Sequence, residues 1–399
     1  MSQRSRLVEI NRRNLAGHRS GEIQRVDDVL EVPVTNYTDP SRWQAEVDRI
    51  FKRIPLVAGF SDEISEKSTY KAIDMVGMPV LLSRDRTGEV RAFVNTCSHR
   101  GAIIMPPGTG KARSFSCPYH AWTYNSQGDL VAILDEEDFG EVDSTCLGLT
   151  SLPVLERAGL IWVILSPEPV IDFDTYFQSY DEVLGYLELD ECHHVGSQRI
   201  DGPNWKICYD GYLDLYHLPV LHKESFGDAF SNRANYDAWG PHQQVSTPSL
   251  DLEDLEESPP EKWPTDRLAS GLSTLFPHVS IARRAAGDGS IMVSQLFPGS
   301  EVGSSYTIQN FLVRGELTDE RVESAQQSMD FLRKVVADED YRTCERIQRT
   351  LLTGAKPNVL FGRNEGGGQT FHRWVDAVVE TDDSALAELF ETGPADWSA

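Results

Sequence analysis

The chain has 399 residues, 40% of them hydrophobic and 25% charged, which is enough for two domains with separate cores. A formal net charge of −25 argues against nucleic acid or an anionic membrane as the main partner. The first residues, MSQRSRLVEINRRNLAG, lack the apolar core of a signal peptide, and the longest apolar run, at 158–165, is too short to cross a bilayer. We therefore expect a cytoplasmic protein whose six cysteines do not form a disulfide framework.

The residue pattern of the first half of the chain changes from polar to β-rich. Residues 1 to about 60 are polar, with SRWQAEVDRIFKRI as a candidate amphipathic helix. From about Ser68 to Leu165, short β-rich runs such as MPVLLSR, VRAFVNT and GLIWVIL are separated by Gly, Pro and Asp turns, a pattern typical of a small antiparallel β domain. SPEPVIDFD at 166–174 marks a boundary. The predicted segments are 1–50, 51–166 and 167–399.

The last segment contains runs of helices and runs of strands. Helical patterns occur around 174–188 and 205–217, strands around 275–313, and a long helix is predicted from about 318 to 353. Because helices and strands are segregated instead of alternating, we predict an α+β fold. The glycine-rich RNEGGGQ at 363–369 lacks the spacing of a dinucleotide site and is predicted to be a loop.

Two short segments each hold one cysteine and one histidine. The pattern is Cys97-x-His99, then 17 residues, then Cys117-x-x-His120. Two thiolates and two imidazoles suit a soft metal centre, and a Cys2His2 zinc site is one alternative. The segments fall in turns of the β-rich region, and each supplies one ligand of each kind, which favours a [2Fe–2S] cluster held between two loops. The other cysteines lack such partners and are predicted to be small core residues: Cys146, Cys192, Cys208 and Cys344.

A second motif lies in NWKICYDGYLDLYHLPVLHKESFG, which contains Asp214-x-x-His217-x4-His222. Asp214 and His217 are three residues apart and would share a helix face, so the carboxylate could accept a hydrogen bond from an imidazole. The two histidines lie roughly 140° apart on an ideal helix, which is poor for binding one ion. Pro219 would have to break the helix for the rings to converge. The alternative is two ordinary histidines near a helix end.

A third ligand for such a site is predicted on the long helix. Asp340 falls inside its apolar stripe, whereas Asp338 points to the opposite side and Glu339 lies at the margin. A buried carboxylate is costly unless it is paired or binds a metal, so the alternative is an ion pair with a buried base. The stripe itself consists of Met329, Leu332, Val336, Cys344, Ile347 and Leu351.

These motifs resemble one known family. CSHRGA and CPYHAWTY resemble the two halves of the Rieske motif. The order of these motifs, then NWK…D-x-x-H-x4-H, then EDYRTCERIQ resembles the α subunits of Rieske non-haem iron oxygenases over most of the chain. The resemblance implies that Cys97 and Cys117 bind one iron of a [2Fe–2S] cluster and that His99 and His120 bind the other.

The resemblance also implies which domain each of the three segments forms. Residues 51–166 would be the Rieske domain, and 167–399 a catalytic domain with an antiparallel sheet flanked by helices in a helix-grip-like arrangement. The helical segment 1–50 would pack on the catalytic domain. The implied ligands of a mononuclear Fe(II) are His217, His222 and Asp340.

A bridging residue and an assembly are implied as well. Asp214 would link His217 to His120 of a neighbouring subunit, so that electrons cross between subunits of a ring-shaped homotrimer, with or without a β subunit. A reductase, with or without a ferredoxin, would supply electrons from NAD(P)H, and O2 would be the co-substrate. In this chain Asp210 stands where many members have asparagine, and Asp214 stands where some members acting on quaternary amines have glutamate.

The implied reaction is hydroxylation of a small aromatic or alicyclic substrate, as in aromatic hydrocarbon catabolism, with O- or N-demethylation as the alternative. Two further readings are an electron carrier with an inactive second domain and a zinc-stabilised binding protein. Arg283 or Arg284 could pair with a substrate carboxylate. An apolar cavity is predicted from residues near the second motif, namely Leu218, Val220, Leu221 and Phe226.

Overall fold

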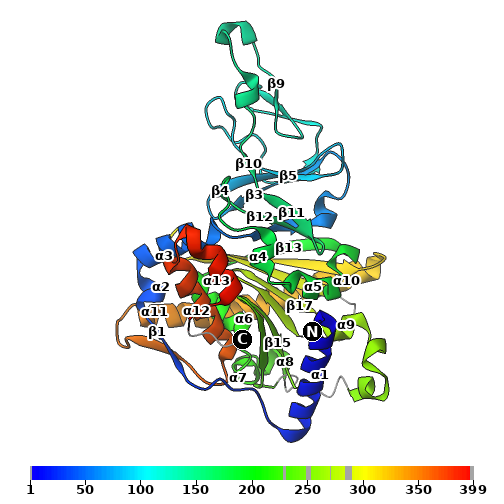
Figure 1. Cartoon of the computed structure of the whole chain (residues 1–399), viewed down its shortest axis with the longest axis vertical. Helices are drawn as coiled ribbons and strands as arrows, with labels where there is room; N and C mark the ends of the chain where they lie inside the picture. Colours follow the sequence, from blue (N-terminus) through cyan, green and yellow to red (C-terminus); the bar gives the residue numbers. More distant parts are fainter. Residues whose placement is uncertain (1, 228–230, 249–252, 270, 284–289, 396–399) are drawn as a thin grey trace. The chain divides into compact units, whose positions relative to one another are not determined.

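The structure is a computed structural model, and it describes residues 2–227, 231–248, 253–269, 271–283 and 290–395 (Figure 1). The chain forms two compact units. Unit 2 consists of residues 51–173, and unit 1 consists of residues 1–50 together with 174–399. Among the helices of the described ranges, none is both long and apolar enough to cross a membrane.

Unit 2 is built from short antiparallel strands in three small sheets. Their orders are β10-β5-β4-β3-β6, β11-β12-β2 and β7-β8-β9. The first sheet comprises β3 (Thr69–Met75), β4 (Met78–Arg84), β5 (Val90–Val94), β6 (Gly108–Lys111) and β10 (Ser151–Leu152). The other two comprise β2 (Leu56–Phe60), β11 (Val154–Arg157) and β12 (Leu160–Val163), and β7 (Ser114–Ser116), β8 (Thr123–Asn125) and β9 (Leu130–Ala132).

The turns of unit 2 follow from local chemistry. The β3–β4 hairpin turns at Val76 and Gly77, both with positive φ, as a tight two-residue turn that matches the strand twist requires. The core beneath the strands is aromatic and includes the buried side chains of Phe93, Phe115 and Tyr124. This core also encloses the predicted cluster cysteines, so the loops that carry them rest on a rigid base.

Unit 1 contains one seven-stranded antiparallel sheet, in the order β13-β19-β18-β17-β16-β15-β14. Its strands are β13 (Cys192–Gly202), β14 (Asn235–Trp239), β15 (His242–Ser246), β16 (Leu272–Leu275), β17 (Val279–Arg283), β18 (Ser290–Pro298) and β19 (Ser305–Arg314). Many side chains of the inner strands are buried amides and hydroxyls, including Ser294, Gln309 and Asn310. Helices on the sheet therefore meet a surface that is only partly apolar.

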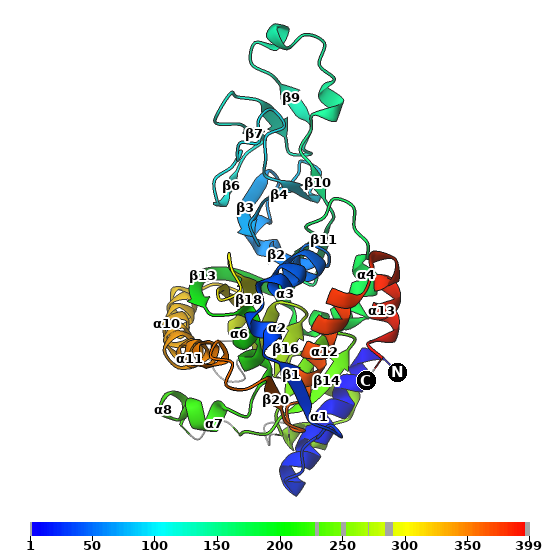
Figure 2. The ribbon, with the colours of Figure 1, turned by 90° about the vertical axis from the view of Figure 1, so that its left-hand side faces the viewer.

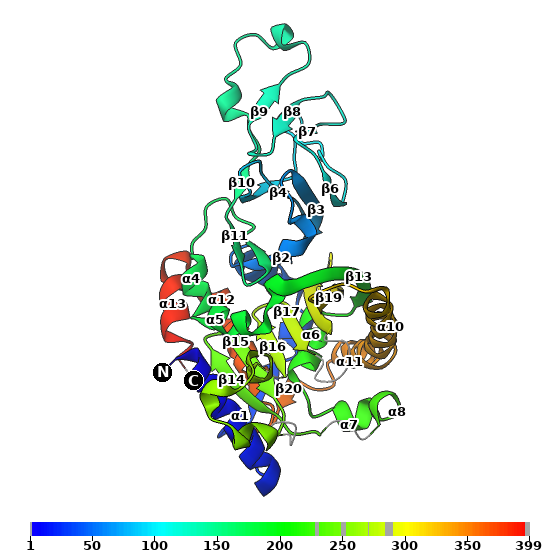
Figure 3. The same ribbon diagram turned by 90° about the vertical axis from the view of Figure 1, so that its right-hand side faces the viewer.

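Helices pack on this sheet from several parts of the chain. The principal ones are α1 (Gln3–Ser20), α6 (Trp205–Leu213), α10 (Asp319–Val335), α11 (Arg342–Leu351) and α12 (Gly366–Glu380). Figures 2 and 3 show α10 and α11 on one side of the unit, and α1 on the opposite side. Helix α10 contacts β13 and β19, and α6 contacts β18 and β19. The α6 and α10 helices thus carry the second predicted site over the same end of the sheet.

The N-terminal segment is tied to unit 1 by polar contacts. Ser2 caps α1 by accepting a hydrogen bond from the Ser5 amide. The Asn14 amide donates to the Ser246 hydroxyl on β15 at 2.9 Å, and the Asn235 amide on β14 donates to Asn14 at 2.7 Å. Strand β1 (Leu30–Pro33) pairs with β20 (Asn358–Phe361), which joins an N-terminal segment of the chain to a C-terminal one.

The long C-terminal helix is interrupted. A π-helical turn at Val336–Tyr341 separates α10 from α11, where the sequence predicts one continuous helix. Ile347 is 41% exposed, so the predicted apolar stripe is not buried along its whole length. The glycine run at 366–368 forms the first turn of α12, so its prediction as a loop is wrong. An added Cβ at Gly367 would lie 2.5 Å from the Tyr236 ring, which explains a residue without a side chain there.

Candidate functional site

The first site lies in two loops of unit 2 that have the same backbone design. The loop after β5 is closed by hydrogen bonds from the Gly101 amide to the Cys97 carbonyl oxygen, and from the Cys97 amide to the Ala102 carbonyl oxygen. The loop after β7 repeats both bonds, from the amides of Ala121 and Cys117. Gly101 and Ala121 both have positive φ, at 75° and 56°. Each loop therefore presents its cysteine and histidine from an equivalent tight turn.

The side chains of these loops face one another. Cys97 and Cys117 are buried, and the rings of His99 and His120 lie 4.7 Å apart between centroids. The Nδ1 atoms of both histidines are buried and have no hydrogen-bond partner among the residues that the structure describes. Buried nitrogens are costly to leave unsatisfied, so an occupant that binds them is expected. The donor set of two thiolates and two imidazoles fits a [2Fe–2S] cluster of the Rieske type.

Neighbouring groups hold the cysteine and histidine ligand candidates in place. The His99 ring stacks on Trp122 at 4.8 Å with nearly parallel planes. The Tyr124 hydroxyl lies 3.3 Å from the Cys97 sulfur and accepts a hydrogen bond from the Ser98 amide at 2.9 Å. Burial, together with the contact to Cys97, raises the pKa of Tyr124 to about 12, so the hydroxyl stays protonated. A hydroxyl beside a cluster sulfur is one means of tuning a reduction potential.

The second site begins where α6 ends. Asp214 follows the last residue of α6 and has extended backbone, at φ −101° and ψ 108°. The expectation that Asp214 and His217 share a helix face is therefore wrong, although their side chains still meet. The short helix α7 (Leu218–Leu221) begins directly after His217, with Pro219 in its first turn, and ends at His222. Because the proline stands in a first turn, it separates two helices instead of kinking one.

This broken backbone lets the two histidines converge on Asp340. The Nε2 atoms of His217 and His222 lie 3.5 and 3.1 Å from Asp340 Oδ1. One candidate ligand atom from each of these residues lies within 4.8 Å of the other two. Two imidazoles and one carboxylate on one side of an ion are the donor set typical of non-haem Fe(II) oxygenases. The residues fit a mononuclear iron and leave room in its coordination sphere for other ligands.

The remaining ring nitrogens are bound by two further carboxylates. His217 Nδ1 lies 3.2 Å from Asp214 Oδ2, and His222 Nδ1 lies 2.7 Å from Glu339 Oε2. Glu339 is itself held by a hydrogen bond from the Ser225 hydroxyl. A carboxylate behind each imidazole fixes the ring orientation and keeps Nε2 free for a metal.

The role of Glu339 is the part of this site that the sequence did not predict. On an ideal helix Glu339 lies only at the margin of the inward face, and it ranks there as a substitute ligand for Asp340. The π-helical turn changes this spacing because its hydrogen bonds reach five residues along the chain. Both Glu339 and Asp340 consequently point to the histidines. The sequence does contain a signal for these two roles. Two adjacent carboxylates, Glu339 and Asp340 in ADEDY, can supply one residue to bind the metal and one to orient a histidine.

In the absence of a metal, the carboxylates of this site favour protonation of its two histidines. Burial lowers the pKa of His217, but hydrogen bonds to Asp214 and Asp340 outweigh it and raise the value to about 9. The pKa of His222 is also raised, against burial, by Asp340 and Glu339. Burial favours the neutral form of Asp340, yet the two histidines keep its pKa below the usual range. A divalent cation would replace these protons.

Other predicted residues lie elsewhere. Asp210 bonds the Tyr37 hydroxyl at 2.9 Å and His372 Nε2 at 2.8 Å, in a buried network of its own. Val220 is 81% exposed, so its place in an apolar cavity is wrong. Cys146 is exposed and not a core residue, because it lies in a surface turn. Cys192, Cys208 and Cys344 are buried as predicted. Arg283 ends β17, and Arg284 lies outside the described residues.

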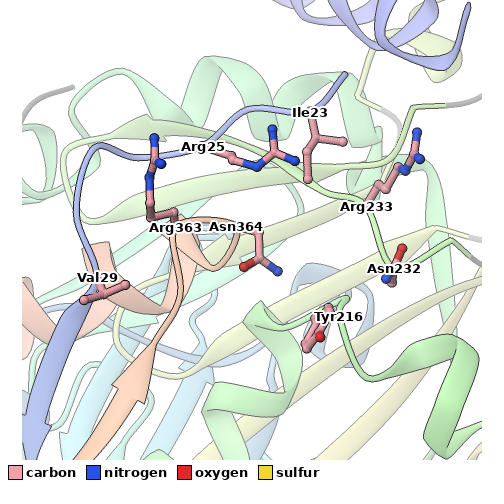
Figure 4. A pocket seen from close by; sticks show the side chains of 8 residues that line it. All are labelled: Ile23, Arg25, Val29, Tyr216, Asn232, Arg233, Arg363 and Asn364. Carbon is pink, nitrogen blue, oxygen red and sulfur yellow. The ribbon is translucent and has the colours of Figure 1, made fainter. Parts of the chain in front are cut away.

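A cavity of about 580 Å³ opens beside this site in unit 1. Figure 4 shows Tyr216, which lies between Asp214 and His217 in the sequence, on one side of the cavity, and three arginines around it. The arginines are Arg25, Arg233 and Arg363.

Two family models match the chain. The model of the Rieske [2Fe-2S] domain matches residues 55–144, and the model of the ring hydroxylating alpha subunit (catalytic domain) matches residues 189–381.

Curated relatives extend over most of the chain. Choline monooxygenase of Spinacia oleracea is 26% identical over 382 residues, which cover 89% of this chain and 79% of that protein. The carnitine monooxygenase oxygenase subunit of Escherichia coli K12 is 27% identical, covering 80% of this chain and 84% of that protein. A shorter match of 27% identity joins the chain to the anthranilate 1,2-dioxygenase large subunit of Acinetobacter baylyi, over 49% of this chain and 43% of that protein.

Solved structures share the fold. The apo form of the quaternary ammonium Rieske monooxygenase CntA superposes with a TM-score of 0.74 at 20% identity, covering 88% of this chain and 96% of that one. Naphthalene 1,2-dioxygenase from Rhodococcus sp. superposes with a TM-score of 0.73 at 20% identity, covering 94% and 99%.

Proposed function

Because the chain belongs to the Rieske non-haem iron oxygenases, as an oxygenase α subunit, we propose that its two metal centres occupy the two sites described above. The observation that supports the iron site best is the convergence of two histidines and one carboxylate from distant segments. The residues proposed to bind the mononuclear iron are His217, His222 and Asp340. The residues proposed to bind the cluster are Cys97, His99, Cys117 and His120.

Asp214 is the proposed bridge for electrons. One carboxylate oxygen contacts His217 Nδ1, and the side chain remains 28% exposed, so it is open to a group from outside unit 1. In a ring-shaped homotrimer that group would be His120 of a neighbouring copy. The electron path would then run from a cluster histidine through Asp214 to an iron histidine, and hydrogen bonds would join these three side chains.

The chain's own residues prepare the iron site for chemistry. When bound, the iron activates O2 with electrons that the cluster delivers singly. Glu339 orients His222, and Asp214 orients His217, so both rings present Nε2 to the ion. The electrons come from NAD(P)H through a reductase, with or without a ferredoxin.

The proposed substrate is a small polar amine that is oxygenated at a carbon next to nitrogen. The buried hydroxyls of Tyr212 and Ser294 lie together near the iron site, since Tyr212 interacts with both Ser294 and the Asp340 carboxylate. Burial raises the pKa of Tyr212 to about 12, and the nearby Asp340 carboxylate adds to the effect. A substrate with polar groups could hydrogen-bond to such hydroxyls, whereas a hydrocarbon could not. The names of the choline and carnitine monooxygenases, which match most of the chain, point to the same class.

A ring compound is the second candidate. It is favoured by Asp214, because some family members that act on quaternary amines have glutamate at the bridging position. The match to anthranilate 1,2-dioxygenase is in keeping with an aromatic carboxylate.

The test is O2 consumption by the iron-loaded protein with a reductase and NADH. The panel would contain choline, carnitine, glycine betaine, their dimethylamino analogues, benzoate and anthranilate. We expect product formed in proportion to O2 with an amine, and formaldehyde where an N-methyl group is removed. Coupled turnover with the aromatic acids alone would shift the assignment to ring oxygenation. No substrate-dependent uptake with any compound, in a protein whose cluster is reduced normally, would favour an electron carrier.

A further inference from the structure

The cavity beside Asp214 is positively charged in a strongly acidic chain. Three of the eight residues that line it are arginines, and none is a carboxylate (Figure 4). Arg233 donates to the Gly21 carbonyl oxygen at 2.8 Å, and Arg363 donates to the Val26 carbonyl oxygen at 2.9 Å. Within the described ranges, neither arginine forms an ion pair with a carboxylate. Their remaining N–H donors are therefore free to bind acidic groups. We call this feature, lined by Arg25, Arg233, Arg363 and Tyr216, the arginine cavity.

The complementary charge lies next to the predicted cluster in unit 2. The segment LDEEDFGEVD at 134–143 contains six carboxylates and no basic residue. Every residue from Leu134 to Glu141 is exposed. Phe139 packs its ring against His99, with 5.6 Å between centroids, and against Trp122 at 5.5 Å. The acidic segment 135–143 is thus anchored to a cluster histidine while its carboxylates extend into solvent.

Both features flank the ends of the proposed electron path. Tyr216 of the arginine cavity lies two residues after Asp214, and Phe139 of the acidic segment touches a proposed cluster ligand. If His120 of one copy meets Asp214 of another, the surfaces around these two residues must face each other. Exposed apolar side chains also occur on both surfaces, with Tyr119 at 61% exposure beside His120 and Tyr216 at 55%.

We propose that the acidic segment 135–143 of one copy docks at the arginine cavity of a second copy and thereby aligns the cluster with Asp214. The proposal rests on the proposed function, because the bridge through Asp214 names the occupant as a second copy. Opposite charges fix the register of an interface and suppress wrong pairings. Since cavity and segment are different surfaces, the contact is heterologous, and three such contacts close a ring.

Charge reversal tests this docking. The cavity variant is Arg233→Glu with Arg363→Glu, the segment variant is Glu136→Lys with Glu137→Lys, and the fourfold variant combines them. Sedimentation equilibrium of the metal-loaded protein measures assembly of the 44.7 kDa chain. We expect the cavity variant to assemble at least about tenfold more weakly, because like charges then meet. The segment variant should also assemble more weakly, because the net charge of its acidic segment falls from −6 to −2. The fourfold variant should assemble more tightly than the cavity variant, because the introduced lysines then face the introduced glutamates.

A matched control reverses two arginines away from the cavity. Arg346→Glu with Arg349→Glu changes the same charge on exposed positions of α11 and should leave assembly unchanged. Iron, sulfide and the visible spectrum report whether each variant is folded. Equal assembly of all variants would overturn the docking, as would a fourfold variant that assembles no more tightly than the cavity variant. Normal assembly with slower reduction by the reductase would also overturn it, and would assign the arginine cavity to that partner.

The mass measurement separates this inference from the function itself. Assembly that responds to charge as expected, in a protein without oxygenase turnover, would support the docking and reject the proposed function. Turnover that is indifferent to both reversals would reject the docking alone.

Discussion

The two proposed metal sites are built in different ways. The cluster site consists of two turns of one small β domain, each closed by its own backbone hydrogen bonds and resting on an aromatic core. The iron site joins the end of α6 and the short α7 to a π-helical turn, and His222 and Glu339 are 117 positions apart in the sequence. A site made of local turns is largely formed by the loops themselves, whereas the iron site exists only when α6 and α10 are packed on the sheet.

The difference extends to the surroundings of the ligands. At the cluster site the histidine Nδ1 atoms are buried and have no hydrogen-bond partner among the described residues, which suits nitrogens that bind a metal. At the iron site both Nδ1 atoms are already bound by carboxylates, and it is Nε2 that faces the centre. We infer that the first site depends on its cluster to bind these nitrogens, whereas the second is preorganised by hydrogen bonds between its histidines and two carboxylates.

The largest expected effect is the loss of a cluster ligand. Cys97→Ser should reduce acid-labile sulfide from about two per chain to near zero, because a hydroxyl is a poor ligand for the cluster iron. Sulfide analysis and the visible spectrum measure this. Cys146→Ser is the matched control, since Cys146 is an exposed thiol in the same unit, and it should retain the cluster. A cluster that survives in Cys97→Ser would contradict the assignment.

Removing the carboxylate of the iron site should separate the two sites. Asp340→Ala should abolish substrate oxygenation and leave about two irons per chain instead of about three, with the cluster spectrum unchanged. Asp338→Ala removes an exposed carboxylate from the same π-helical turn and should behave like the wild type. Full iron content and turnover in Asp340→Ala would move the third ligand to another residue.

Asp214→Asn should leave both metals bound but slow electron transfer between them. The amide cannot provide the charge that holds His217 and a second imidazole, so we expect cluster reoxidation in a single turnover to slow by roughly 10- to 100-fold. Rapid mixing of the reduced protein with substrate and O2 measures the rate. Asp214→Glu, which keeps the charge, should recover part of it. A normal rate in Asp214→Asn would reject the bridge.

Glu339→Gln should have a smaller effect, on metal affinity. The amide still reaches His222 but removes the charge that stabilises its Nδ1–H, so Fe(II) binding should weaken by about tenfold. Anaerobic titration of the metal-free protein measures this. Complete loss of iron would instead indicate that Glu339 is itself a ligand.

The last prediction concerns the protons that the iron ligands bind in the metal-free protein. His217 has a folded-state pKa of about 9, above the ordinary histidine value of 6.5, so protonation stabilises the metal-free protein fully below pH 6.5. That contribution is lost as the pH rises through about 9. Because iron must displace the proton, affinity should increase by about tenfold per pH unit between pH 7 and 9 for each proton released. The number of protons taken up when a chelator removes the iron should equal the number released on binding. An iron affinity that does not change between pH 7 and 9 would contradict a raised pKa of His217.

The sequence by itself determined the α+β class and indicated the candidate ligands of the cluster and of the iron. The Cys-x-His and Cys-x-x-His pairs are readable because all four residues lie in local turns, where spacing along the chain decides geometry. Pro219 likewise indicated a break between the iron histidines, and a proline in a first turn separates two helices in the structure.

Only the tertiary structure decided how the iron site is assembled. An ideal 100° spacing placed Asp340 inward but could not show the π-helical turn that also brings Glu339 to His222. The extended backbone of Asp214, the exposed positions of Cys146 and Val220, and the arginine cavity were equally hidden. All of these features depend on which distant elements pack together. Packing is determined by the shape and burial of side chains across the whole unit, and the periodicity of one segment carries no information about it.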